Sequence, residues 1–136
     1  MRFASREWIA ALVKALNAHP DLPRGLSGLG RDAAFVVEAE PPARPRSVAA
    51  WAEHDGRRIA AWRLLEDEDE VLELEPAYVI RAPLRVFRAI LEGADPVQAA
   101  LSGRVRVEGD LEALVRRAQY RYMVDAALGA VPTEFP

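Results

Sequence analysis

The side chains that most often carry catalysis are few in this sequence and widely separated. The chain has two histidines, His19 and His54, and no cysteine, which excludes disulfides, thiol nucleophiles and thiolate metal sites. Neither histidine has a partner at the spacing of a metal site or of a catalytic triad. His19 stands before Pro20 at an expected helix end, and His54 flanks an expected turn. We therefore expect no catalytic residue and no metal site.

Other motifs support the same expectation. No serine lies in a Gly-x-Ser-x-Gly turn, and the glycine-rich stretch 25–30 lacks the preceding strand and the lysine of a phosphate loop. The acidic run 66–70 lacks the ligand spacing and the central glycine of a calcium loop, so a solvated turn is expected there. The four serines are Ser5, Ser27, Ser47 and Ser102.

One cluster of basic residues leaves two interpretations open. Arg116, Arg117 and Arg121 fall on the outer side of the expected last helix. They form either a solvated helix face or a weak site for a phosphate or carboxylate head group. The net charge of the whole chain is −3 with both signs mixed, which argues against nucleic acid as a partner.

Length and composition indicate one globular domain over residues 1–136. Apolar residues make up 51% of the chain and charged residues 29%. The first 20 residues carry Glu7 and Lys14 inside their apolar pattern, unlike the core of a signal peptide. A cytoplasmic location is therefore expected.

The pattern of apolar residues, caps and turns predicts an α+β protein with a mostly antiparallel sheet covered by helices on one face. Val71–Leu74 is expected to be strand-like. The expected elements are a helix after Ser5, a strand over 33–39, a hairpin over 47–65, strand-like segments at 71–74 and 78–80, helices over 83–93 and 97–101, a strand over 104–108, and one helix from Asp110 to Gly129.

The hairpin is expected to turn at Asp55-Gly56, the pair that best suits a two-residue type I′ turn. This register places Trp51 and Trp62 on one face of the sheet. The expected partners are Glu53 with Arg58, Ala52 with Ile59, Trp51 with Ala60, and Ala49 with Trp62.

The helices of the second half carry many bulky apolar side chains for one small sheet. Periodicity cannot distinguish a packed core from a lined cavity, so both remain open at this point. The inward positions of the three helices are Phe87, Ile90, Leu101, Leu114, Val115 and Met123.

From about Ala77 onward, the chain resembles the sterol carrier protein type 2 family of lipid-binding domains. The most specific part of the resemblance is Asp95-Pro96 followed by a strand between Gly103 and Gly109 and then by Asp110. The residues that carry it are Tyr78 to Pro83, Phe87, Ile90, Gly93 to Pro96, Ala99 to Leu101, and Ser102 to Leu111.

The resemblance implies a five-stranded sheet with helices over one face, and a hydrophobic tunnel between them. It also implies no catalytic residues and no cofactor. The chain ends Glu134-Phe135-Pro136 rather than in a peroxisomal tripeptide, so it looks like the bacterial stand-alone form.

We therefore expect a non-enzymatic protein that binds or transfers a fatty acyl chain, an acyl-CoA, a quinone or a sterol-like lipid. The alternative is a cavity-bearing scaffold or dimerisation module that assists a lipid- or quinone-handling enzyme. A transient membrane-surface contact and a homodimer are left open. The tail 129–136 is expected to cover the tunnel mouth with Phe135 as a removable plug. The expected ligand-binding residues are Phe87, Ile90, Leu101, Leu114, Val115, Met123 and Phe135.

Overall fold

A five-stranded sheet organises the chain, and the computed structural model describes all residues from 1 to 136. The elements in chain order are α1 (Arg6–Asn17), α2 (Leu22–Leu26), β1 (Asp32–Glu38), β2 (Val48–His54), β3 (Ile59–Leu65), α3 (Asp69–Leu74), β4 (Tyr78–Pro83), α4 (Leu84–Leu91), α5 (Pro96–Leu101), β5 (Arg106–Glu108), α6 (Leu111–Arg116), the 3₁₀ turn η1 (Ala118–Tyr120) and α7 (Arg121–Gly129).

The strands lie in the order β3-β2-β1-β4-β5. The β1–β4 pair is parallel and the other three pairs are antiparallel, so the sheet is mixed but mostly antiparallel. β1 is the central strand, and its Ala34 and Val36 are fully buried. The expected α+β class with five strands is confirmed.

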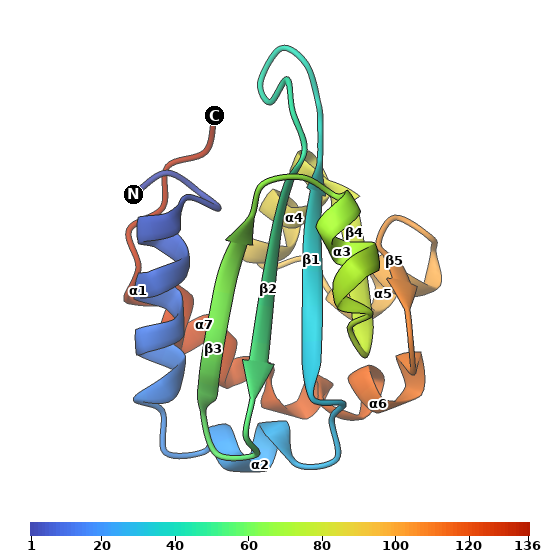
Figure 1. Cartoon of the computed structure of the whole chain (residues 1–136). Helices are drawn as coiled ribbons and strands as arrows, with labels where there is room; N and C mark the ends of the chain where they lie inside the picture. The colour runs from blue at the N-terminus through green and yellow to red at the C-terminus, as the bar shows by residue number, and fades with distance from the viewer.

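The two faces of the sheet are covered unequally. In Figure 1, α3 lies in front of the sheet while α4 and α7 lie behind it. We call the face that bears α3 the α3 face and the opposite one the helix face. On the α3 face, Val71 packs in one cluster with Ala34, Val36 and Ala49. The expectation that helices cover only one face is therefore incomplete, because α3 covers part of the other.

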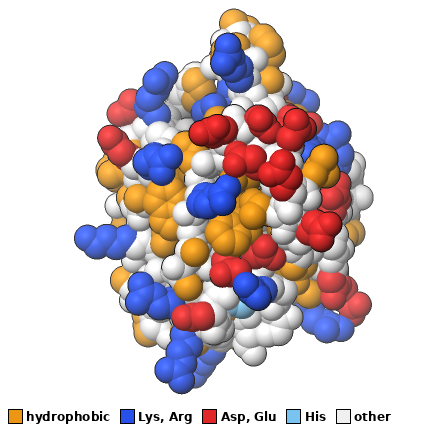
Figure 2. Space-filling model, viewed as in Figure 1, with side chains coloured by type: hydrophobic (Ala, Val, Ile, Leu, Met, Phe, Trp, Pro, Cys, Tyr) orange, Lys and Arg blue, Asp and Glu red, His pale blue; other side chains and the backbone are white.

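The segment Val71–Leu74, expected to be strand-like, belongs to helix α3 instead. A run of four residues, three of them apolar, fits a strand and a short helix equally well. The acidic residues before it favour the helix, since Asp69 and Glu70 stand in its first turn, where negative charge is favourable. Figure 2 shows acidic side chains gathered over this part of the α3 face.

The hairpin register also differs from the expected one. Trp51 lies opposite Arg63 rather than Ala60, and Ala52 lies opposite Trp62 rather than Ile59. The strand β2 carries an irregularity at its last two residues, 53 and 54, just before the turn.

The connection between β2 and β3 is longer than the expected two-residue turn. Asp55 Oδ1 accepts hydrogen bonds from the backbone N–H groups of Arg57 and Arg58, each at 3.0 Å. These bonds hold the four residues 55–58 together as the connection, so the paired residues start further along the chain.

This shift of three residues moves the two tryptophans to opposite faces, since an odd shift exchanges the faces of a strand. Trp51 points to the α3 face and packs on its cluster. Glu53 pairs with Arg31 over 2.8 Å instead of with Arg58.

The expected single helix from Asp110 to Gly129 is interrupted. α6 ends at Arg116, η1 follows, and α7 starts at Arg121. The sequence between them contains no proline or glycine, so no local breaker marks the interruption. The break allows α6 to stay near β5 while α7 runs back behind the sheet to α1 (Figure 1).

Candidate ligand-binding cavity

A cavity of about 490 Å³ lies between the helix face of the sheet and the surrounding helices. Its lining comprises 26 residues, of which 21 are hydrophobic. The volume falls within the roughly 300–1,000 Å³ of small-molecule sites. The cavity therefore has the size and the chemistry to hold an apolar molecule.

The floor of the cavity is a row of apolar side chains on neighbouring strands. Phe35 on β1 pairs in register with Ile80 on β4, and Ile80 pairs with Val107 on β5. All three line the cavity. Phe35 is 40% exposed although it lies on the central strand, so the other side chains cover it only in part.

The walls come from short helices, two of which have a side-chain cap at the N-terminus. Asp95 accepts a hydrogen bond from the N–H of Val97 and thereby starts α5, and Asp110 starts α6 by accepting from Ala113. α2 and the residues after it close another side with apolar groups. Residues of these walls include Leu22, Gly25, Leu26, Leu29, Ile90, Val97, Ala100, Leu114, Val115 and Met123.

Four of the expected ligand-binding residues line the cavity: Ile90, Leu114, Val115 and Met123. They come from three helices, α4, α6 and α7. Helical spacing placed these four residues on the inward side of their helices.

The other three expected residues lie outside the lining. Phe87 packs into the core beside Phe3, with ring centroids 6.4 Å apart. Leu101 is 66% exposed at the last turn of α5. The Phe135 ring lies 5.2 Å from that of Phe3. Phe87 lies one turn before Ile90, but α4 presents it to the N-terminal core rather than to the cavity.

The tail does not cover the cavity as expected, because it pairs with the N-terminal segment. The backbone N–H of Phe3 donates to Glu134 O over 2.9 Å, and the N–H of Glu134 donates to Met1 O over 2.8 Å. Val131 is buried in the core cluster. No residue of 130–136 lines the cavity. Phe135 therefore does not lie where a plug of the tunnel mouth, as predicted from the sequence, would have to lie.

Sequence reasoning missed the floor of the cavity and the α2 wall. Phe35, Ile80 and Val107 each lie in a strand whose faces were not assigned to an interior. The signal available was alternation in 104–108, which places Val107 on a different face from its charged neighbours. The α2 wall lies in a Pro/Gly-rich stretch, a composition typical of a link, and its residues are Leu22, Leu26 and Leu29.

Known structures resemble this arrangement over almost the whole chain. A crystal structure of sterol carrier protein 2 matches with a TM-score of 0.77 at 22% identity, covering 96% of this chain and 99% of that one. The chain has the sterol carrier protein 2 fold. No family model and no curated protein matches the sequence.

Two further structures share this sterol carrier protein 2 fold. One is the solution structure of a conserved hypothetical protein of Thermus thermophilus, suggested to be a sterol carrier protein. It has a TM-score of 0.76 at 22% identity and covers 95% of this chain and 90% of its own. The other is named UbiJ-SCP2, a ubiquinone synthesis protein. It has a TM-score of 0.55 at 16% identity and covers 87% of this chain and 85% of its own.

Within this sterol carrier protein 2 fold, the charged side chains of the cavity are Arg117, Arg121 and Asp125. Arg121 is fully engaged: it donates to the carbonyl oxygens of Ile90 over 2.9 Å and Ala94 over 2.7 Å. It also pairs with Asp125 over 3.4 Å. These contacts hold α4 and α7 together at one side of the cavity.

Arg116 and Arg117 have different surroundings, although they are neighbours in the sequence. Arg116 is exposed and pairs with Glu112 one turn earlier. Arg117 lines the cavity, and its buried Nε has no hydrogen-bond partner. The cluster expected from the sequence is therefore split between solvent and cavity.

The two histidines serve local structure. His19 Nδ1 accepts from the N–H of Asp21 over 3.1 Å, and His54 contacts Gly30 O through Nε2 over 2.8 Å. Neither lines the cavity. No group of three His, Cys, Asp or Glu residues is close enough together to hold a metal ion.

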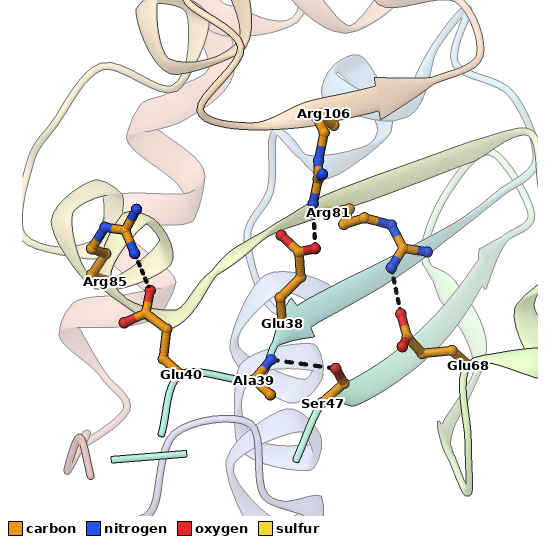
Figure 3. Close-up of polar contacts among 8 residues, drawn as sticks. All are labelled: Glu38, Ala39, Glu40, Ser47, Glu68, Arg81, Arg85 and Arg106. Carbon is orange, nitrogen blue, oxygen red and sulfur yellow. Dashed lines mark hydrogen bonds and ion pairs between the residues drawn. The ribbon is translucent and has the colours of Figure 1, made fainter. Parts of the chain in front are cut away.

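A second, smaller hollow of about 240 Å³ lies on the α3 face, where β4 meets β5. Its two arginines are already paired, Arg81 with Glu68 and Arg106 with Glu38 (Figure 3). Because these guanidinium groups have protein partners, the apolar cavity is the stronger candidate site. None of the helices is long and apolar enough to span a bilayer.

Proposed function

We propose that this protein binds a hydrophobic small molecule in its apolar cavity and carries it without changing it chemically. The observation that carries the proposal is the partly exposed side chain of Phe35 on the central strand, at the floor of a cavity of about 490 Å³. A core side chain in that position would normally be covered, because burying apolar surface contributes about 25 cal/mol per Å². A ligand in the cavity would supply the missing cover.

The ligand class is a fatty acyl chain, a quinone or a sterol-like lipid. The names of two similar structures, both sterol carrier proteins or suggested to be, support a lipid. In this proposal the cavity is part of a tunnel, and loosening of its short helical walls admits the ligand. The chain supplies burial and orientation only.

Ligand uptake by the isolated protein tests the proposal. A fluorescent fatty acid, a decyl-chain quinone and cholesterol are titrated, and at least one should bind with a dissociation constant of about 1 μM or lower, which corresponds to about 8 kcal/mol. Leu114→Arg should abolish binding, because it places a charge among apolar lining groups.

Matched variants separate loss of the cavity from loss of the fold. Leu101→Arg and Leu72→Arg make the same change at side chains that are 66% and 76% exposed, and both should bind as the unchanged protein does. Ala100→Trp fills the cavity without a charge and should also block binding, whereas Ala126→Trp on the exposed side of α7 should not. Circular dichroism checks that each variant is folded. Binding by none of the three probes would contradict the proposal.

A second candidate is a cavity-bearing module that assists a lipid- or quinone-handling enzyme. It is favoured by the similarity to a structure named as a ubiquinone synthesis protein. In that case the isolated protein takes up no ligand, and a partner enzyme co-purifies with it from its own host. Native mass spectrometry of the purified protein distinguishes a bound lipid from a bound protein.

A further inference from the structure

Arg117 is the one charged side chain of the cavity that has no partner. Arg121 and Asp125 satisfy each other, and Arg121 also donates to two carbonyl oxygens. The side chain of Arg117 makes no hydrogen bond and no ion pair, and its Nε is shielded from solvent. The lining therefore carries one uncompensated positive charge, on a guanidinium whose N–H donors have no acceptor in the protein.

The position of Arg117 is set by the elements on both sides of it. It is the C-cap residue that follows α6, and its guanidinium lies against Gly28 in the connection after α2. A Cβ at position 28 would overlap Nη2 of Arg117, so glycine makes the room for this group. Gly25 and Leu29, on either side of Gly28, line the cavity. The guanidinium thus lies in the wall between α6 and the α2 connection.

A guanidinium in an apolar wall has a preferred partner. Its planar fork of N–H donors matches a carboxylate, which accepts two parallel hydrogen bonds from Nε and one Nη. Every acidic group of the protein that lines the cavity is already paired with Arg121. No acidic side chain of the lining is therefore free to pair with Arg117, and a ligand is the remaining source of a carboxylate.

We infer that Arg117 determines the head-group specificity of this cavity: its guanidinium binds the carboxylate of a single-chain amphiphile, a long-chain fatty acid, whose chain lies over Phe35, Ile80 and Val107. This inference rests on the proposed function and narrows it. It selects an anionic ligand over a neutral one of the same chain length. Sterols and quinones, which carry no carboxylate, are then secondary ligands of this cavity.

Two probes with the same chain and different heads test the inference. Palmitate and 1-hexadecanol are titrated into the full chain by displacement of a neutral fluorescent lipid. We expect palmitate to bind about 10- to 100-fold more tightly, the range of a charge-assisted bidentate contact. Arg117→Met should remove this preference and leave hexadecanol binding within about threefold, since Met keeps much of the apolar stem.

Two further variants control for charge and for folding. Arg116→Met removes a neighbouring positive charge that already has a partner, and it should keep the preference. Arg117→Lys keeps a charge but lacks the fork, so an intermediate preference is expected, and it replaces Arg117→Met if that variant fails to fold.

The outcomes distinguish the inference from the proposed function. Equal affinity of the unchanged protein for palmitate and hexadecanol overturns the carboxylate inference. The protein would then be a carrier that does not distinguish charged from neutral head groups. A preference that is undiminished in Arg117→Met also overturns it, as does an undiminished preference in Arg117→Lys where that variant takes the place of Arg117→Met. If neither probe binds the unchanged protein, the proposed function itself fails.

Discussion

The phenolic O–H of Tyr122 on α7 donates to Asp21 Oδ2 just before α2, over 2.6 Å. The ring of His19 lies edge-on to that of Tyr122, with centroids 5.7 Å apart. The next residue after each partner, Leu22 and Met123, lines the cavity. A contact between residues 101 positions apart therefore fastens two cavity walls to each other.

Tyr122→Phe should loosen these walls and lower stability in a pH-dependent way. The hydrogen bond to Asp21 is the main cause that raises the pKa of Tyr122 above its usual value of 10.0. A raised pKa in the folded state means that the contribution is fully present below pH 10 and is lost as the pH rises through the folded pKa. Urea unfolding should therefore show a difference between the two proteins at pH 7 that shrinks above pH 10. A constant difference would show that the hydrogen bond is not its source.

Deleting Val131–Pro136 should destabilise the protein by about 2–4 kcal/mol, from the loss of a buried valine and of strand-like pairing. Val131 is 4% exposed, and Thr133 Oγ1 accepts from Trp8 Nε1 over 2.9 Å. Urea unfolding measures the change. Thr133→Val isolates the tryptophan contact and should cost about 1 kcal/mol. An unchanged midpoint for the deletion would show that the tail is only loosely attached.

Asp32→Ala should lower the free energy of unfolding by about 1–3 kcal/mol. The two carboxylate oxygens of Asp32 connect β1 with β2 and with the residue just before β4. Oδ2 accepts from Trp51 Nε1 on β2, and Oδ1 accepts from the N–H of Ala77 before β4, both at 2.8 Å. Asp32→Asn keeps one acceptor oxygen and should cost less. Glu73→Ala, at an exposed carboxylate of α3 that makes no hydrogen bond, is the control and should change the midpoint little. Equal effects of the three substitutions would contradict the assigned role.

Gly109→Ala should lower the thermal stability of the protein far more than Gly93→Ala. Both glycines have positive φ, 109° and 117°, so each substitution introduces strain of about 1–3 kcal/mol. Only at Gly109 would the new Cβ overlap the carbonyl oxygen of Ala77, whereas nothing lies within 4 Å at Gly93. Thermal unfolding of the two variants compares strain alone with strain plus overlap. Similar melting temperatures would show that the β4–β5 end yields to the added methyl group.

Local chemistry was readable from the sequence alone. Asp95 and Asp110 stand before helices whose first N–H groups need acceptors, and both cap as expected. Helical spacing predicted Ile90, Leu114, Val115 and Met123 as inward residues of α4, α6 and α7, and all four line the cavity. The resemblance carried by residues 78–111 added the fold and its five-stranded sheet, which the structure confirms.

Relationships between distant segments were decided only by the tertiary structure. The hairpin register depended on how Asp55 bonds to the turn, and an odd shift separated Trp51 from Trp62. Whether Phe87 or Phe35 faces the cavity depended on which elements compete for each ring. Spacing along one element states which side chains share a face, but it does not state what that face meets. The packing of all elements together decides that, because an apolar side chain can be buried only against a surface that the rest of the chain leaves open.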